Sequence, residues 1–156
     1  IHDMDVTCLR YFNACGRNVE AGLFEEHDPE THLIPLLARN KTATIYGTDW
    51  PTKDGTCIRD YVHVIDICRA HILAYKNMEL NPGTNISINI GTGQGHSVKE
   101  VVDKVNEIIH NGTMEIVTQS RREGDVAYLV ASTQLANMIL NFRAEYTLDD
   151  IIESMK

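Results

Sequence analysis

Strand-like and helix-like segments alternate along this 156-residue chain, and the alternation is the strongest constraint on its fold. Alternating β and α segments are typical of α/β folds, in which helices pack on a largely parallel sheet. A doubly wound sheet normally has five or more strands, whereas the strands expected here are few and far apart. The chain is therefore expected to supply only part of such a sheet. Strands are expected at residues 6–12, 42–46, 86–90, 114–118 and 128–131, and helices at 31–40, 64–80 and 132–140, with two more beginning at Ser97 and Thr147.

Two polar residues mark expected helix starts. Thr31 is expected to cap its helix, with Pro35 in the first turn, where a missing N–H costs little. Ser97 and Glu100 have the spacing of a capping box, in which each side chain bonds the other's backbone N–H.

The composition excludes several classes of protein. Hydrophobic residues make up 43% of the chain and charged residues 23%, an ordinary globular mixture for one domain with a core. The net charge of −8 argues against nucleic-acid binding, which depends on clustered Lys and Arg. No apolar run approaches the ~18 residues of a membrane span, and no secretory leader is apparent. We expect a cytoplasmic protein with no membrane partner, and we expect Ile1 to lie inside a longer protein.

Metal binding is not expected from the sequence. The four cysteines form no CxxC pair and the seven histidines form no HExxH motif, spacings that are typical of zinc sites. The densest group of possible ligands is the run from His27 to His32, which also contains Asp28 and Glu30. Pro29 interrupts its spacing, and a polar loop explains its composition.

A glycine-rich segment, Gly91 to Gly95, lies between an expected strand and an expected helix, where phosphate-binding loops occur. Its spacing is GxGxG rather than GxGxxG, and no P-loop lysine follows. A tight strand-to-helix turn is the simpler interpretation, and a phosphate cradle is the alternative.

The segment DGTCIRDYVHVID, residues 54–66, is far more specific. If it is extended, Arg59 and Tyr61 lie on one face, where the arginine can bind a phosphate and the tyrosine can add a hydroxyl. The alternative is an Arg–Asp surface pair, which contributes little. In RREGD, residues 121–125, Arg122 can supply positive charge and Asp125 can accept from sugar hydroxyls; a solvated turn is the alternative there.

Six segments occur in one order along nearly the whole chain: LRYFN at 9–13, HLIP at 32–35, IYGTD at 45–49, DGTCIRDYVHVID at 54–66, NIGTG at 89–93 and RREGD at 121–125. In order and spacing the chain resembles the UDP-glucose 4-epimerases, a family of extended short-chain dehydrogenase/reductases. The resemblance implies a Rossmann-type α/β fold. Residues 1–156 would be its C-terminal UDP-sugar-binding portion, including late strands of the NAD-domain sheet, and the N-terminal NAD-binding domain would be absent.

The resemblance also implies ligand contacts for eleven residues. Tyr11 and Phe12 would border the nicotinamide of NAD. The other nine would contact a UDP-hexose: Asn13, His32, Leu33, Thr44, Tyr46, Arg59, Tyr61, Arg122 and Asp125.

Among these nine, the resemblance separates the nucleotide contacts from the diphosphate contacts. Arg59 and Arg122 would hold the diphosphate, and Tyr61 would line that part of the pocket. Tyr46 would lie against uracil, since an aromatic face gives apolar area at low entropy cost. Asp125 would bond the ribose.

The family's reaction implies that the chain acts with a missing partner domain. Hydride leaves the sugar C4 for NAD while a tyrosine takes the hydroxyl proton, and the 4-keto sugar turns about its diphosphate before hydride returns to its other face. The family's GxxGxxG loop and YxxxK pair do not occur in this sequence. No catalytic residue is expected here, and the chain alone is expected to be inactive. The full-length enzyme would be a homodimer in galactose metabolism.

Three hypotheses follow from the sequence. The first is a C-terminal portion of a UDP-hexose 4-epimerase. The second is a stand-alone, non-catalytic UDP-sugar-binding module, which differs in having no GxxGxxG and YxxxK motifs encoded upstream. The third is a generic α/β interaction domain, for which Arg59 and Arg122 would be unimportant to nucleotide-sugar binding.

Overall fold

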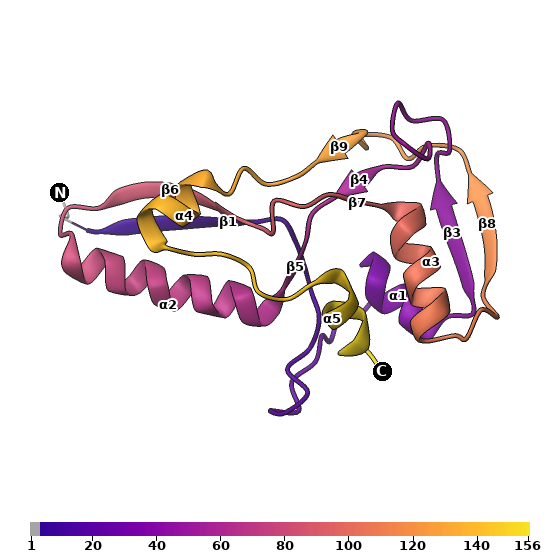
Figure 1. Ribbon diagram of the computed structural model, residues 1–156, viewed down its shortest axis with the longest axis horizontal. Helices are drawn as coiled ribbons and strands as arrows, with labels where there is room; N and C mark the ends of the chain where they lie inside the picture. Colours follow the sequence, from indigo (N-terminus) through magenta and orange to yellow (C-terminus); the bar gives the residue numbers. More distant parts are fainter. Residues whose placement is uncertain (1–3) are drawn as a thin grey trace.

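The computed structural model describes residues 4–156, and one end of the molecule is built on two parallel strands (Figure 1). Strands β1 (Val6–Tyr11) and β6 (Asn85–Ile90) pair in parallel, with Val6 opposite Asn85. Helix α2 (Val64–Leu80) runs along this pair, and α4 (Gln134–Leu140) packs beside it. An apolar cluster at this end contains buried side chains of these elements, together with Val62 and with Phe142 after α4; its other members include Ile67, Ala70, Ile88, Ile90 and Ala136.

The other end is built around a second parallel pair. Strands β3 (Thr42–Tyr46) and β8 (Glu115–Gln119) lie beside helices α1 (Leu33–Arg39) and α3 (Val98–Ile108), with α5 (Leu148–Glu153) against α3. The second apolar cluster includes Ile34, Leu37, Ala43, Ile45, Val101, Val102, Val105, Ile151 and Ile152.

Short strands connect the two ends. Strand β2 (Asn13–Cys15) pairs in parallel with β5 (Tyr61–His63). Strand β4 (Ile58–Arg59) lies between β7 (His96–Ser97) and β9 (Tyr128–Leu129). The expected α/β class is confirmed, and within residues 4–156 each sheet has only two or three strands. The described helices are too short or too polar for any of them to be a membrane span.

The expected start of α1 is wrong, because His32 rather than Thr31 is the N-cap. The helix begins at Leu33, two residues after Thr31, and its N-cap, His32, makes no side-chain capping bond. Glu30 Oε1 instead accepts hydrogen bonds from the backbone N–H groups of Thr31 and His32, both at 2.8 Å. The backbone of His32 is extended, at φ −80° and ψ 140°, so the helix begins after this residue.

The expected capping box of α3 is half formed. Ser97 Oγ accepts from the N–H of Glu100 at 3.1 Å, as the motif requires. The Glu100 carboxylate instead contacts His96 Nδ1 at 2.7 Å and Lys53 Nζ at 3.0 Å. Tertiary partners have replaced the local bond, and the helix still begins after Ser97.

Candidate functional site

A cavity of about 800 Å³ lies where the two ends of the molecule meet. Its walls come from the ends of β1 and β2, the start of α1, strands β3 to β5 and the β8–β9 loop. This size lies within the range of small-molecule and cofactor sites. All eleven residues with a predicted ligand contact line it: Tyr11, Phe12, Asn13, His32, Leu33, Thr44, Tyr46, Arg59, Tyr61, Arg122 and Asp125.

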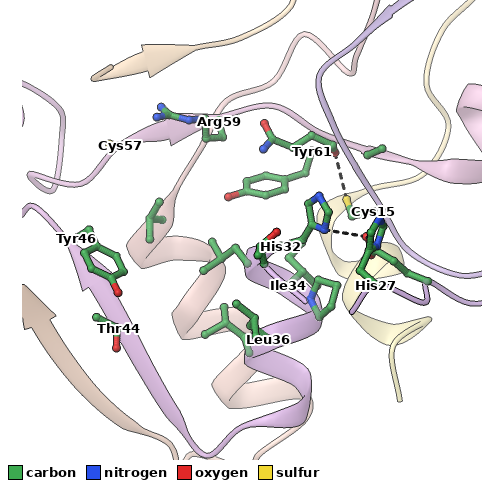
Figure 2. Close-up of a pocket in the computed structure, with 18 of the residues that line it drawn as sticks. Cys15, His27, His32, Ile34, Leu36, Thr44, Tyr46, Cys57, Arg59 and Tyr61 are labelled. Carbon is green, nitrogen blue, oxygen red and sulfur yellow. Dashed lines mark hydrogen bonds and ion pairs between the residues drawn. The ribbon is translucent and has the colours of Figure 1, made fainter. Parts of the chain in front are cut away.

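Strand β3 supplies one wall through alternation of its side chains. Ala43 and Ile45 are buried in the core, at 1% and 4% exposure. Thr44 and Tyr46 therefore point to the opposite face and into the cavity, as Figure 2 shows. The Arg122 guanidinium carbon lies 3.9 Å from the centroid of the Tyr46 ring, an arrangement that places a cation over an aromatic face.

The neighbouring Arg121 has a different environment, which separates two arginines that are adjacent in sequence. Its Nε donates to Asp49 Oδ1 at 2.8 Å, and its guanidinium lies 3.9 Å from the Trp50 ring centroid. The hydrogen bond from Arg121 lowers the pKa of Asp49. The Arg121 side chain thus binds the β3–β4 loop through Asp49 and does not line the cavity, whereas Arg122 does.

Arg59 is fixed at the cavity rim by three hydrogen bonds. Its Nη1 donates to the carbonyls of Ile58 and Val126, at 2.9 and 2.8 Å, and its Nη2 donates to Asp125 Oδ1 at 3.1 Å. The alternative of an Arg–Asp pair is thus present, but as part of the cavity wall: the Arg59 side chain is only 13% exposed. A guanidinium has five N–H donors, so others remain for an anion.

Tyr61 and two buried thiols form the cavity's less polar side. The Tyr61 phenol points into the cavity (Figure 2). The residue as a whole is 5% exposed. Burial raises the pKa of Tyr61, so it remains a neutral hydroxyl donor rather than a base. Burial also raises the pKa of Cys15 and Cys57, which keeps both thiols protonated and unreactive.

The glycine-rich loop connects β6 to the short strand β7, which precedes α3, and its amides already have a partner. Asp60 is fully buried and accepts from the N–H groups of Thr92 and Gly93, each at 2.9 Å. It also accepts from the Thr92 hydroxyl at 2.7 Å and from the Ala131 N–H at 3.1 Å. A carboxylate of the protein itself thus occupies the place that a phosphate would take in a phosphate-binding loop.

The run from His27 to His32 is more organised than a solvated loop. Together with Glu25, residues His27, Glu30 and His32 bring four ligand-type atoms within 4.8 Å of one another. The interruption of the sequence spacing by Pro29 does not prevent these groups from lying close together. Burial raises the pKa of Glu30, but hydrogen bonds from His32 and Thr31 outweigh that effect and lower it overall.

Sequence reasoning missed several residues of the cavity. Glu25 and His27 line it from an irregular loop, where no periodic pattern could place them. Cys57 also lines the cavity. It could have been predicted, because Cys57, Arg59 and Tyr61 are alternate residues of one segment and an extended chain places alternate side chains on the same face. Helix α1 contributes apolar residues to the cavity wall, and the sequence alone indicates only that such residues belong to the core.

The comparisons with known proteins agree with this arrangement. Residues 2–91 match the NAD dependent epimerase/dehydratase family. A UDP-glucose 4-epimerase of Rhizobium meliloti (strain 1021) is 42% identical over 151 residues, which are 94% of this chain and 45% of that protein. The chain spans about half the length of the curated relatives it matches.

Solved structures give the same result. The UDP-glucose 4-epimerase of Brucella ovis, in complex with NAD, matches with a TM-score of 0.87 and 41% identity, over 97% of this chain and 48% of that one. The enzyme of Bifidobacterium longum, in complex with NAD+ and UDP, matches with a TM-score of 0.88 and 31% identity, over 98% and 47%.

The fold places the chain in the class of mixed α/β proteins that are related to Rossmann-type enzymes. Within that class, the chain belongs to the NAD dependent epimerase/dehydratase family.

Proposed function

We propose that this chain is the C-terminal, UDP-sugar-binding portion of a UDP-glucose 4-epimerase. The observation that carries the proposal is the convergence of all eleven predicted contact residues on one cavity. Relatives named UDP-glucose 4-epimerase at about 40% identity support the reaction class. In this chain's cavity, two arginines would neutralise the diphosphate of a dianionic substrate.

In the proposed clamp, three groups of residues contact the substrate. Arg59 and Arg122 bind the diphosphate, with the Tyr61 hydroxyl beside it. Tyr46 and Thr44 border the uracil, and Asp125 bonds the ribose. Asn13, His32 and the Leu33 backbone complete the contacts.

NAD is the cofactor of the proposed enzyme, and it supplies the hydride acceptor when bound. The described residues could form only one edge of an NAD site. Tyr11 and Phe12 line a smaller hollow of about 280 Å³, together with Asn13 and Leu129. A Gly-rich dinucleotide loop and a YxxxK pair are not in the sequence. This chain therefore orients the sugar nucleotide, and the base belongs to the N-terminal half.

The exposure of the β1–β6 sheet supports a missing N-terminal domain. Parallel sheets are normally covered on both faces, yet Cys8, Arg10 and Tyr11 of β1 are exposed. We propose that further strands of the NAD domain cover or extend this sheet, and that the complete enzyme is a cytoplasmic homodimer of galactose metabolism.

The test combines titration of UDP-glucose with two variants and a control. Calorimetry with UDP-glucose on the full-length protein should show that Arg59→Ala and Arg122→Ala each weaken binding by about 10- to 100-fold, the value of a charge-assisted hydrogen bond. Arg143→Ala is the control, since Arg143 is exposed and lies outside the cavity. Unchanged affinity in both cavity variants would support the generic interaction domain instead.

A second measurement separates the epimerase from a stand-alone module. The proposal expects GxxGxxG and YxxxK in frame upstream of Ile1, and conversion of UDP-glucose to UDP-galactose by the complete protein. A start codon at Ile1, with UDP binding by the 156-residue chain and no conversion, would identify the non-catalytic module.

A further inference from the structure

Four side chains of the loop before α1 converge on one point beside the cavity. Glu25 Oε1 lies 3.0 Å from the Nδ1 atoms of both His27 and His32. His32 Nδ1 also lies 2.9 Å from Glu30 Oε1. The centroids of the two imidazole rings are 4.8 Å apart. Figure 2 shows His27 and His32 near Cys15.

These separations match the coordination shell of a small divalent cation. Zinc bonds of about 2.0–2.2 Å to histidine nitrogen and carboxylate oxygen place tetrahedral ligand atoms about 3.3 Å apart. The four ligand-type atoms of this cluster lie within 4.8 Å of one another. Two imidazoles with two carboxylates form a nitrogen-and-oxygen set that suits zinc, and the carboxylates balance its double charge.

Glu30 supplies an independent sign that the cluster is built for a cation. Its side chain is only 7% exposed, and its Oε2 is buried with no hydrogen-bond partner among the described residues. A buried carboxylate oxygen without a partner is costly, and a cation bound in the cluster would satisfy it. Its other oxygen is held by the N–H groups of Thr31 and His32, which fix the carboxylate in place.

We propose that Glu25, His27, Glu30 and His32 form a zinc site. Solvent can reach it, because the His27 and His32 side chains are 53% and 49% exposed above the two more buried carboxylates. Bound zinc would join the two ends of the loop from residue 25 to residue 32. It would thereby fix the entry into α1 and the position of His32 on the cavity wall.

The test measures zinc directly, without nucleotide. The full-length protein is stripped with a chelator, dialysed against ZnCl2 and assayed for metal content. We expect one zinc per chain, and His27→Gln and Glu30→Gln should each weaken zinc affinity at least about tenfold. Neither residue is among the proposed UDP-sugar contacts, so this result is independent of the proposed function.

His96→Gln is the matched control, because His96 Nδ1 also lies 2.7 Å from a glutamate, Glu100, outside the cluster. It should leave zinc affinity unchanged. Cobalt substitution gives a second readout, since tetrahedral Co²⁺ has strong visible absorption that the two cluster variants should lose. The absence of bound zinc, or zinc binding that His27→Gln and Glu30→Gln leave unaltered, would refute the site.

Discussion

Replacement of Asp60 by asparagine tests whether one buried carboxylate holds three segments together. Asp60 is fully buried, and its Oδ1 accepts from the Thr92 N–H and hydroxyl. Its Oδ2 accepts from the N–H groups of Gly93 and Ala131. Asparagine keeps the shape but has only one accepting oxygen.

The magnitude follows from counting donors. The best orientation of the new amide places its oxygen toward Gly93 and Ala131, and its nitrogen then faces the Thr92 N–H. That N–H loses its partner, at a cost of about 1–3 kcal/mol, and the two remaining bonds lose their charge. Removal of a buried charge offsets part of the loss. We expect Asp60→Asn to lower the free energy of unfolding by about 2–4 kcal/mol, a large share of the ~5–15 kcal/mol typical of a domain.

Urea unfolding, followed by circular dichroism at pH 7, measures this change. Asp103→Asn is the control: Asp103 is half exposed and pairs with Lys99 on the surface of α3, so its loss should stay within about 0.5 kcal/mol. If Asp60→Asn also falls within about 0.5 kcal/mol of the original protein, the reasoning about the buried carboxylate is refuted.

Two further changes test local geometry and titration. Gly55→Ala should lower the free energy of unfolding by at least ~2 kcal/mol, because Gly55 has φ +80° and an added Cβ would lie 2.2 Å from the Thr48 carbonyl oxygen. Gly83→Ala, with φ +87° but no atom within 4 Å, should cost about 1 kcal/mol, and equal losses in urea unfolding would contradict the steric argument. Burial lowers the pKa of His63 below its ordinary value of 6.5, despite the attraction of Asp66, so the unfolded chain takes up its proton more readily. Stability should therefore fall as the pH drops from 7.5 to 5.5, and His63→Asn should reduce that slope; an unchanged slope would exclude His63 as the cause.

The sequence predicted those elements whose pattern is set locally. The bounds of β3 and α2 agree with prediction, because alternation and 3.6-residue periodicity reflect which face is buried. The expected start of α1 was wrong because the backbone of His32 is extended and His32, not Thr31, is the N-cap, while Glu30 binds the N–H groups of Thr31 and His32. The sequence motif for α3 was only half right for a different reason, since the distant Lys53 binds the Glu100 carboxylate in place of the capping bond.

The same distinction applies to the cavity. Arg59 and Tyr61 were predictable from their spacing in an extended segment. Spacing alone could not place Arg122 over the Tyr46 ring, since this contact depends on the parallel pairing of β3 with β8. The cluster around Glu25 depends on a loop conformation that has no periodic signature.

The charged residues of segment 54–66 have two different roles: the aspartates hold the fold together, and the residues between them line the cavity. Asp54, Asp60 and Asp66 recur every six residues, and each carboxylate binds a distant part of the chain. The Asp54 carboxylate binds the start of α3, and that of Asp60 binds the loop after β6 and residue 131. The Asp66 carboxylate binds the backbone at residues 145–146. Arg59 and Tyr61 lie beside the middle carboxylate and face the cavity. The acidic residues therefore assemble the segments whose meeting point is the cavity, while the residues between them contact its contents. A substitution at the three aspartates should act through stability, and one at Arg59 through ligand affinity.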